Sequence, residues 1–213
     1  MGVAEELIER ARTGAPAGEC AIAVEDGTLR LAVLLRPAVP MSHYMGILPV
    51  CALGALEGLR PLRGDLALAW PGNVVVPDED GHATQVACAL GVRAGTGEGG
   101  MFVVCSAGVE LAPFAAMASG ELAHAVCSAV ASRVDAWAAD VSAGRGAAGP
   151  VAPVLSDYFD ALALMGRSCE VVYPNGRVAA AGTLTAVDVW GRATVRLADG
   201  RELVVSPEQA SLR

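Results

Sequence analysis

The glycine-rich segment Gly95–Gly100 could serve chemistry, since its spacing has the form Gly-x-Gly-x-x-Gly. Such a motif binds a dinucleotide when a helix follows it directly and presents its N-terminus to the pyrophosphate. Here the run Met101–Cys105 follows, and its residues favour a β-strand. The segment is therefore predicted to be the turn of a β-hairpin rather than a nucleotide-binding loop.

Cysteine and histidine side chains could bind a metal or supply a reactive thiol. No two of the six cysteines have the Cys-x-x-Cys spacing of zinc and redox sites, and only three histidines lie between them. Most of the cysteines lie in apolar runs, which is typical of buried, reduced thiols in a cytoplasmic protein. We predict separate, reduced cysteines and no metal site. The cysteines are at positions 20, 51, 88, 105, 127 and 169.

The charged residues limit the partners that this chain can bind. The formal net charge is −8, whereas a protein that binds nucleic acid needs a cationic surface, so no nucleic-acid partner is expected. All 15 cationic side chains are arginine, and lysine is absent. A site that holds a phosphate through lysine therefore lacks its usual cation.

The location of the protein is predicted from its apolar segments. Three glutamates among the first nine residues stand where a secretory signal needs an apolar run, so a cytoplasmic protein is expected. The stretch Pro37–Leu56 carries no formal charge, but prolines at positions 37, 40 and 49 interrupt it. A buried helix preceded by a loop fits this pattern better than a membrane span, so no membrane partner is expected.

The elements that position these residues alternate between strands and helices. Apolar periodicity and turn residues mark each boundary, with Ser42 and Ser119 as expected helix caps. The predicted elements are a helix over 3–12, strands over 20–24 and 29–35, a helix from 42 to 59, strands over 65–70, 73–76, 86–92 and 101–109, a long helix from 119 and a short helix opening at 156.

The chain changes character after Gly166. Four short strands with tight turns between them predict a small β-barrel of roughly SH3 size. A boundary is therefore expected near Arg167, which divides the chain into a domain over 1–165 and a C-terminal domain over 166–213. The four strands are Cys169–Tyr173, Ala181–Val187, Ala193–Leu197 and Glu202–Val205.

The order of these elements, together with several short motifs, resembles the biotin protein ligases over about nine tenths of the chain. The motifs are Leu34–Pro37, similar to the family's Leu-Leu-Arg-Pro, Ala69–Asn73, similar to Lys-Trp-Pro-Asn-Asp, Val104–Glu110, similar to the segment with Gly-Ile-Gly-Ile-Asn, Leu155–Arg167, similar to the helix before Leu-Gly-Arg, and Ala210–Arg213, similar to Val-Ser-Leu-Arg. The resemblance implies an α+β fold of the class II biotin/lipoate ligase type. Its parts would be a mixed central β-sheet with helices mainly on one face, then a small SH3-like C-terminal barrel.

The departures from the family pattern fall on the motifs that carry chemistry. The family's Gly-Arg-Gly-Arg loop, which orders over biotin and the adenylate, is expected after Asp26, but Gly27-Thr28 leads straight into the next strand. The lysine of Lys-Trp-Pro-Asn-Asp is Ala69 in this chain. A second family lysine is expected after an Asp-Gly turn, where the sequence reads His82-Ala83.

These losses bear on the reaction that the resemblance implies. Adenylation joins a carboxylate to a phosphate, and cations stabilise the charge that develops at the α-phosphate. Losing one preorganised donor typically costs about 10²–10³ in rate, and arginine has a different reach and geometry from lysine. No arginine lies between Asp65 and Gly91. The expectation is a catalytically degenerate homologue with no catalytic residues and no certain cofactor, while a working ligase that uses biotin and ATP stays open as the alternative.

Six residues are candidates for a remnant of the family's ligand pocket. Glu110 stands where the family has asparagine and would repel a carboxylate or phosphate, which favours a neutral or cationic ligand, or none. The structural alternative is that Trp70 merely fills the space left by the deleted loop. Arg36, beside Pro37, is expected to be structural. The candidates are Trp70, Pro71, Asn73, His82, Gly108 and Glu110.

Two classes of function follow from the resemblance. One is a binding or assembly protein whose partner is a biotin carrier protein or a true ligase. The other is an enzyme that still makes or transfers a biotinyl group. Family members often pair through the edge of the central sheet, so the resemblance also implies a homodimer.

Overall fold

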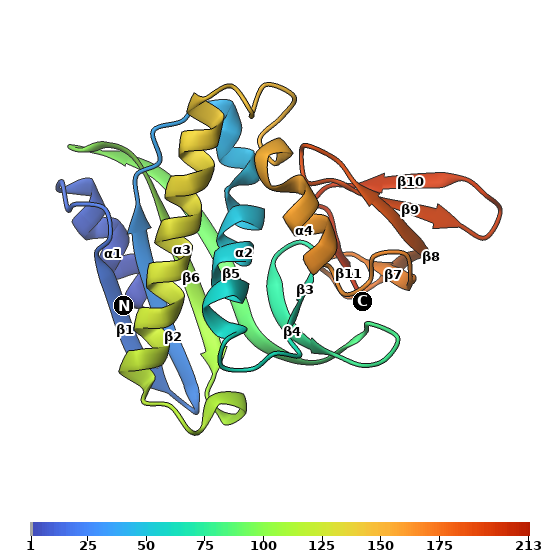
Figure 1. Cartoon of the computed structure of the whole chain (residues 1–213), viewed down its shortest axis with the longest axis horizontal. Helices are drawn as coiled ribbons and strands as arrows, with labels where there is room; N and C mark the ends of the chain where they lie inside the picture. The colour runs from blue at the N-terminus through green and yellow to red at the C-terminus, as the bar shows by residue number, and fades with distance from the viewer. Residues whose placement is uncertain (1) are drawn as a thin grey trace.

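The computed structural model describes residues 2–213 and consists of two β-sheets with the main helices on one side of the larger sheet (Figure 1). The larger sheet has the strand order β1-β2-β6-β5-β4-β3. The hairpin predicted at the glycine-rich segment is confirmed, because β5 and β6 pair as far as Gly97 and Gly100. The strands are β1 (Cys20–Glu25), β2 (Thr28–Leu35), β3 (Ala67–Ala69), β4 (Asn73–Pro77), β5 (Ala83–Gly97) and β6 (Gly100–Glu110).

The larger sheet is antiparallel, so the predicted mixed sheet is wrong. Each pairing between its named strands runs antiparallel, and the parallel contact in the described residues is an isolated bridge between Leu68 and Leu162. The physical reason is the length of the connections. Short turns join β1 to β2, β3 to β4, β4 to β5 and β5 to β6, and a parallel pair would need a much longer crossover.

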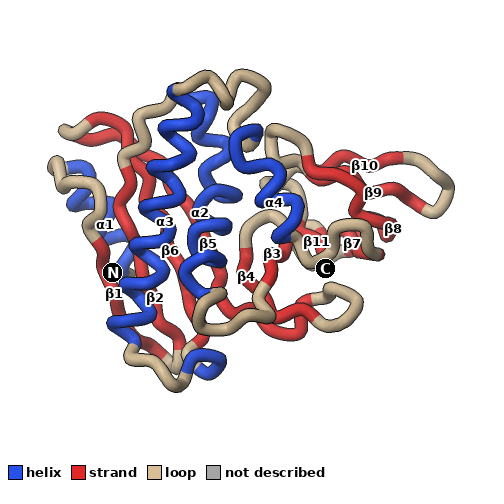
Figure 2. Tube along the Cα trace, viewed as in Figure 1, coloured by secondary structure: helices blue, strands red, loops and turns tan. Residues whose placement is uncertain are grey.

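The two faces of this sheet carry different helices. The helices α2 (Ile47–Leu59) and α3 (Ser119–Ser142) lie side by side on one face, and Figure 2 shows them in front of the strands. On the opposite face, α1 (Val3–Arg12) packs Leu7 and Ala11 against Ala32, Leu34, Phe102 and Val104. Successive side chains of a strand point to opposite faces, so alternate residues of β2 and β6 serve separate hydrophobic clusters.

The start of α2 differs from the prediction. Ser42 lies inside a 3₁₀ helix over Met41–Gly46, and α2 itself begins at Ile47. Proline disrupts a helix interior but is tolerated in the first turn, so Pro49 is compatible with a start at Ile47 and not with one at Ser42. Similarly, α3 begins at Ser119 with Ala118 in the cap position, and no side chain caps it.

The predicted buried helix is confirmed, because α2 exposes little of its surface beyond Leu48, Glu57 and Gly58. Within residues 2–213, no helix is both long enough and apolar enough to cross a membrane.

The C-terminal sheet follows α4 (Leu155–Ala161) and has the strand order β10-β9-β8-β7-β11, all antiparallel. In the described residues the outer strands β10 and β11 each pair with one neighbour, so closure into the predicted barrel is not confirmed. The predicted boundary at 165/166 falls between α4 and β7. The strands are β7 (Ser168–Val172), β8 (Val178–Val187), β9 (Ala193–Leu197), β10 (Glu202–Val205) and β11 (Ser211–Leu212).

Candidate functional site

A cavity of about 900 Å³ lies where the turn between β4 and β5 meets the C-terminal sheet. We call it the junction cavity. Its volume falls within the range that is typical of small-molecule sites. Most of its lining is small or apolar, and the polar or charged side chains in it are His82, Ser168, Glu170, Thr183, Arg196 and Arg213. The small and apolar lining includes Ala69, Ala83, Ala163, Leu164, Ala181 and Leu197.

Ala69 and Ala83, the two positions where the resemblance expects lysine, both line the junction cavity, and the half-buried His82 lines it beside them. The turn that presents His82 is held locally, since its backbone N–H donates to the Asp78 carboxylate at 2.9 Å. Gly81 in the same turn has a φ of +87°, and a Cβ there would meet the Ala163 carbonyl oxygen at 2.2 Å. Glycine is therefore required where this turn touches the segment leading to the C-terminal sheet.

The cations at the junction cavity are already paired. Arg213 Nε donates to Glu170 Oε2 at 2.9 Å, and Arg196 lies 3.5 Å from Glu202. Arg213, Glu170 and Arg196 all line the cavity. Because carboxylates balance these guanidinium groups, the cavity suits a neutral molecule better than a phosphate.

A second hollow, of about 520 Å³, lies on the opposite face of the larger sheet, beside the N-terminal turn of α1. We call it the sheet groove. Gly108 lines it, and a Cβ added at Gly108 would lie 3.0 Å from Arg30 Nη1. Arg93, also in the lining, is paired with Glu5 at 3.0 Å. The groove holds three carboxylates, of Glu5, Glu6 and Glu25, against the guanidinium groups of Arg30 and Arg93, so it too carries no excess of positive charge.

The β1–β2 turn lies at the end of the sheet groove, where the resemblance expects a basic loop. Glu25 pairs directly with Thr28, and Asp26 and Gly27 adopt φ values of +49° and +75°. Two residues with positive φ form the tight turn that suits a hairpin, so no loop extends from this point. Thr28 Oγ1 donates to Glu110 Oε1 at 3.0 Å, which places Glu110 beside the same turn.

Three of the predicted site residues use their polar groups in hydrogen bonds within the fold. Trp70 is 2% exposed, and its Nε1 donates to the Gly191 carbonyl at 2.9 Å, in the C-terminal sheet's β8–β9 turn. The Tyr158 hydroxyl donates to the Pro71 carbonyl at 2.6 Å. Asn73 Oδ1 accepts from the Leu90 backbone N–H at 3.2 Å. None of these three residues lines the junction cavity or the sheet groove, and the geometry favours the structural role for Trp70.

The six predicted residues are thus not gathered into one pocket. His82 lines the junction cavity, Gly108 lines the sheet groove, and Glu110 stands beside the hairpin turn. Sequence matching missed the contribution of the C-terminal sheet, whose residues form about half of the junction cavity lining. No signal along the chain indicates which strands meet across a junction.

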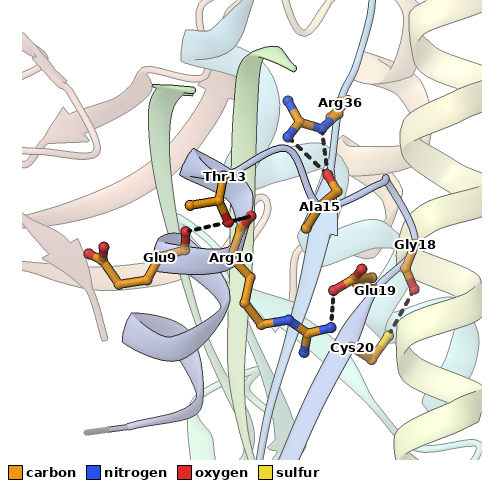
Figure 3. A network of polar contacts seen from close by, with 8 residues as sticks. All are labelled: Glu9, Arg10, Thr13, Ala15, Gly18, Glu19, Cys20 and Arg36. Carbon is orange, nitrogen blue, oxygen red and sulfur yellow. Dashed lines mark hydrogen bonds and ion pairs between the residues drawn. The ribbon is translucent and has the colours of Figure 1, made fainter. Parts of the chain in front are cut away.

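Arg36 is structural, as predicted. Its Nη2 donates to the Ala11 carbonyl at 3.0 Å, and both its Nε and its Nη2 donate to the Ala15 carbonyl (Figure 3). The guanidinium also lies 5.9 Å from the centre of the Phe102 ring. A cation at the C-terminal end of α1 interacts favourably with its free carbonyls, so Arg36 ties α1 to β2.

All six cysteines are free thiols, as predicted, and four of them interact in two pairs. Cys20 interacts with Cys127, and Cys51 interacts with Cys105. The side-chain hydrogen bond with Cys105, together with burial, raises the pKa of the Cys51 thiol. Among the described residues, no three His, Cys, Asp or Glu side chains form a group that could hold a metal.

The fold is similar to that of solved biotin protein ligases. A biotin protein ligase from Aquifex aeolicus in complex with biotin and ATP aligns with a TM-score of 0.72 and 13% identity, over 100% of this chain and 94% of that chain. A biotin protein ligase-like protein of unknown function from Silicibacter sp. gives 0.70 and 18%, over 98% and 91%. The biotin protein ligase from Leishmania major with biotinyl-5-AMP gives 0.53 and 14%, over 96% and 95%.

No protein-family model matches the chain, and no curated protein matches its sequence. At these identities the structural likeness shows the fold alone. The chain therefore has a biotin protein ligase-like α+β fold along its whole length.

Proposed function

We propose that this protein is a catalytically degenerate biotin protein ligase-like protein whose junction cavity binds a neutral, largely apolar small molecule. The observation that carries the proposal is the lining of that cavity. Ala69 and Ala83 stand there at the two positions where the resemblance expects lysine. A site that neutralises phosphate needs cations. At these two positions the junction cavity has methyl groups instead, and its arginines are already paired with carboxylates.

The geometry around the β1–β2 turn supports the same conclusion. A tight two-residue turn occupies the place of the basic loop, and the carboxylate of Glu110 stands beside it. An anionic adenylate next to this carboxylate would be repelled. Both features weaken the binding of ATP independently of the two missing lysines.

A working ligase remains the second candidate, and the structural likeness favours it. The Aquifex aeolicus ligase that overlaps this chain along its whole length was solved in complex with biotin and ATP. Under this alternative, the chain would make biotinyl-AMP and transfer biotin to a lysine of a carrier protein. Biotin and ATP would then both bind to the free protein.

Titration calorimetry separates the two candidates. We expect no heat of binding with ATP. A neutral apolar fluorescent probe, N-phenyl-1-naphthylamine, should bind in the junction cavity. Filling the cavity with Ala83→Trp should reduce the probe's fluorescence enhancement at least about fivefold, because the indole takes up the space available to the probe. Ala94→Trp, at an exposed position of the same strand outside the cavity, is the matched control. Saturable ATP binding, or equal probe binding in both variants, would contradict the proposal.

The partners of the proposed binding protein are inferred from its resemblance to biotin protein ligases. We propose a biotin carrier protein or a true ligase as the protein partner, in the cytoplasm.

A homodimer through the edge strand β1 is proposed as well, since β1 pairs on one side only and exposes Ile22 and Val24 by 53% and 54%. Light scattering of the purified chain should give the mass of a dimer, and Val24→Lys should shift it towards the monomer. A monomeric mass for the unmodified chain would refute the homodimer.

A further inference from the structure

A third hollow, which the proposed function does not use, lies between β1 and α3. Its volume is about 470 Å³, and Cys20, Cys127 and His124 line it. We call it the thiol groove. Cys20 is exposed at the start of β1, whereas Cys127 on α3 is 5% exposed. The fold therefore brings a solvent-accessible thiol and a sheltered thiol to one groove from positions far apart in the sequence.

The two thiols differ in acidity because they interact with each other. The Cys127 thiol donates a hydrogen bond that lowers the pKa of Cys20 to about 7, although partial burial opposes this effect. The same hydrogen bond, together with burial, raises the pKa of Cys127. Near neutral pH a substantial fraction of the accessible thiol is therefore thiolate, the nucleophilic form, and the sheltered thiol keeps its proton.

The surroundings of Cys20 leave its sulfur open to a small reagent. Figure 3 shows Cys20 next to Glu19, whose carboxylate is engaged by Arg10 of α1. In its protonated form the Cys20 thiol donates a hydrogen bond to the Gly18 carbonyl oxygen at 3.5 Å. From α3, the polar groups that line the groove are the exposed His124 and Ser128 and the Cys127 thiol. The nearby carboxylate is thus neutralised by its ion pair and does not confront the thiolate alone.

We propose that Cys20 and Cys127 form an oxidant-sensitive thiol pair, in which Cys20 reacts with a hydroperoxide and Cys127 converts the product into a disulfide between β1 and α3. In the first step the Cys20 thiolate attacks the peroxide, an S–O bond forms and the O–O bond breaks. The alkoxide that leaves takes a proton from solvent and departs as an alcohol, or as water when the oxidant is hydrogen peroxide. Cys20 is then a sulfenic acid.

In the second step the Cys127 sulfur attacks the Cys20 sulfur. The S–S bond forms, the S–O bond breaks, and hydroxide leaves with the Cys127 proton as water. Two thiols are thereby oxidised and one peroxide is reduced. An S–S bond is about 2.05 Å long. The sulfur atoms of Cys20 and Cys127, which already interact, must therefore move closer together through side-chain rotation.

The second thiol pair serves as an internal control. Cys51 and Cys105 also interact, but both are fully buried, and the pKa of Cys51 is raised by the Cys105 hydrogen bond and by burial. Oxidation follows thiolate character and access, so this pair should not react with peroxide while the protein is folded.

The test treats the full-length folded chain with hydrogen peroxide, alkylates the remaining thiols and maps the peptides by mass spectrometry without reduction. We expect loss of two thiols, a disulfide between Cys20 and Cys127 within one chain, and recovery of both thiols with dithiothreitol. Cys20→Ser should abolish this disulfide. Cys127→Ser should leave a sulfenic acid on Cys20 that dimedone traps. Cys51→Ser should change neither result.

A second readout does not depend on the oxidant. At pH 7, iodoacetamide should alkylate Cys20 of the folded chain roughly five- to tenfold faster than in urea, because the gain in thiolate exceeds the loss of intrinsic nucleophilicity. A disulfide between Cys20 residues of two chains, a disulfide between Cys51 and Cys105, or peroxide treatment that spares Cys20 would each overturn the proposal. If the buried Cys127→Ser change prevents folding, the peptide maps of the unmodified chain and of the Cys20→Ser variant still test the proposal.

Discussion

Replacing Trp70 with alanine is expected to lower the free energy of unfolding by about 3–5 kcal/mol, the usual cost of removing a large buried side chain. Trp70 is 2% exposed and lies in the turn between β3 and β4. Its Nε1–H donates to the Gly191 carbonyl in the C-terminal sheet. The substitution therefore opens a void and also leaves a buried carbonyl without its donor. Urea unfolding followed by circular dichroism measures the loss.

Two further variants separate the void from the hydrogen bond. Trp70→Phe retains most of the ring and loses the N–H, so it should cost about 1–3 kcal/mol. Trp190→Ala removes a tryptophan next to Gly191 that is 45% exposed, and it should change stability by less than about 1 kcal/mol. Equal losses for Trp70→Ala and Trp190→Ala would show that Trp70 does not hold the two sheets together.

Strands and hairpins could be predicted from the sequence because their signals are local. The pairing of Glu25 with Thr28 follows from the Asp26-Gly27 turn, and the β5–β6 hairpin follows from Gly95–Gly100. Pro49 favours a start of α2 at Ile47, which is where the helix begins. The capping preference of Ser42 instead favoured a start at Ser42. Competing local signals of similar strength explain the error at this boundary.

The candidate site could not be assembled from the sequence, because its members meet through tertiary structure. Gly108 and Ala107 are neighbours in β6, yet they face opposite sides of the sheet, and the Ala107 side chain packs into the larger hydrophobic cluster. Likewise, Ala69 and Ala83 line a cavity only because the strands β7, β8 and β9 complete it. The pairing of Cys20 with Cys127 depends on how α3 lies across β1, which periodicity does not specify.

The proposed loss of ligase activity would involve more than one position of the fold. The two positions without lysine border the junction cavity, while the shortened turn and Glu110 lie at the end of the sheet groove. These two regions lie at different parts of the larger sheet. Changes in both would have to be reversed together before a phosphate could be held.

Exchange of pyrophosphate into ATP in the presence of biotin is expected to equal the rate without protein. This reaction reports the first step, formation of the acyl-adenylate, and it needs no acceptor lysine from a partner. Each missing donor typically costs about 10²–10³ in rate, and three cationic elements are absent together. A biotin protein ligase in the same assay serves as the positive control, and circular dichroism checks that the chain is folded. Exchange well above background would overturn the degenerate reading and imply an arginine-based site.

Restoring the lysines tests which loss is decisive. The double variant Ala69→Lys with Ala83→Lys should still show no exchange, because the tight turn at Asp26-Gly27 supplies no basic loop and Glu110 still repels the phosphate. The matched variant Ala69→Met with Ala83→Met has side chains of similar length without the charge, so it controls for crowding of the cavity. Exchange that appears with lysine and not with methionine would show that the two ammonium groups suffice, and that the missing loop is dispensable for adenylation.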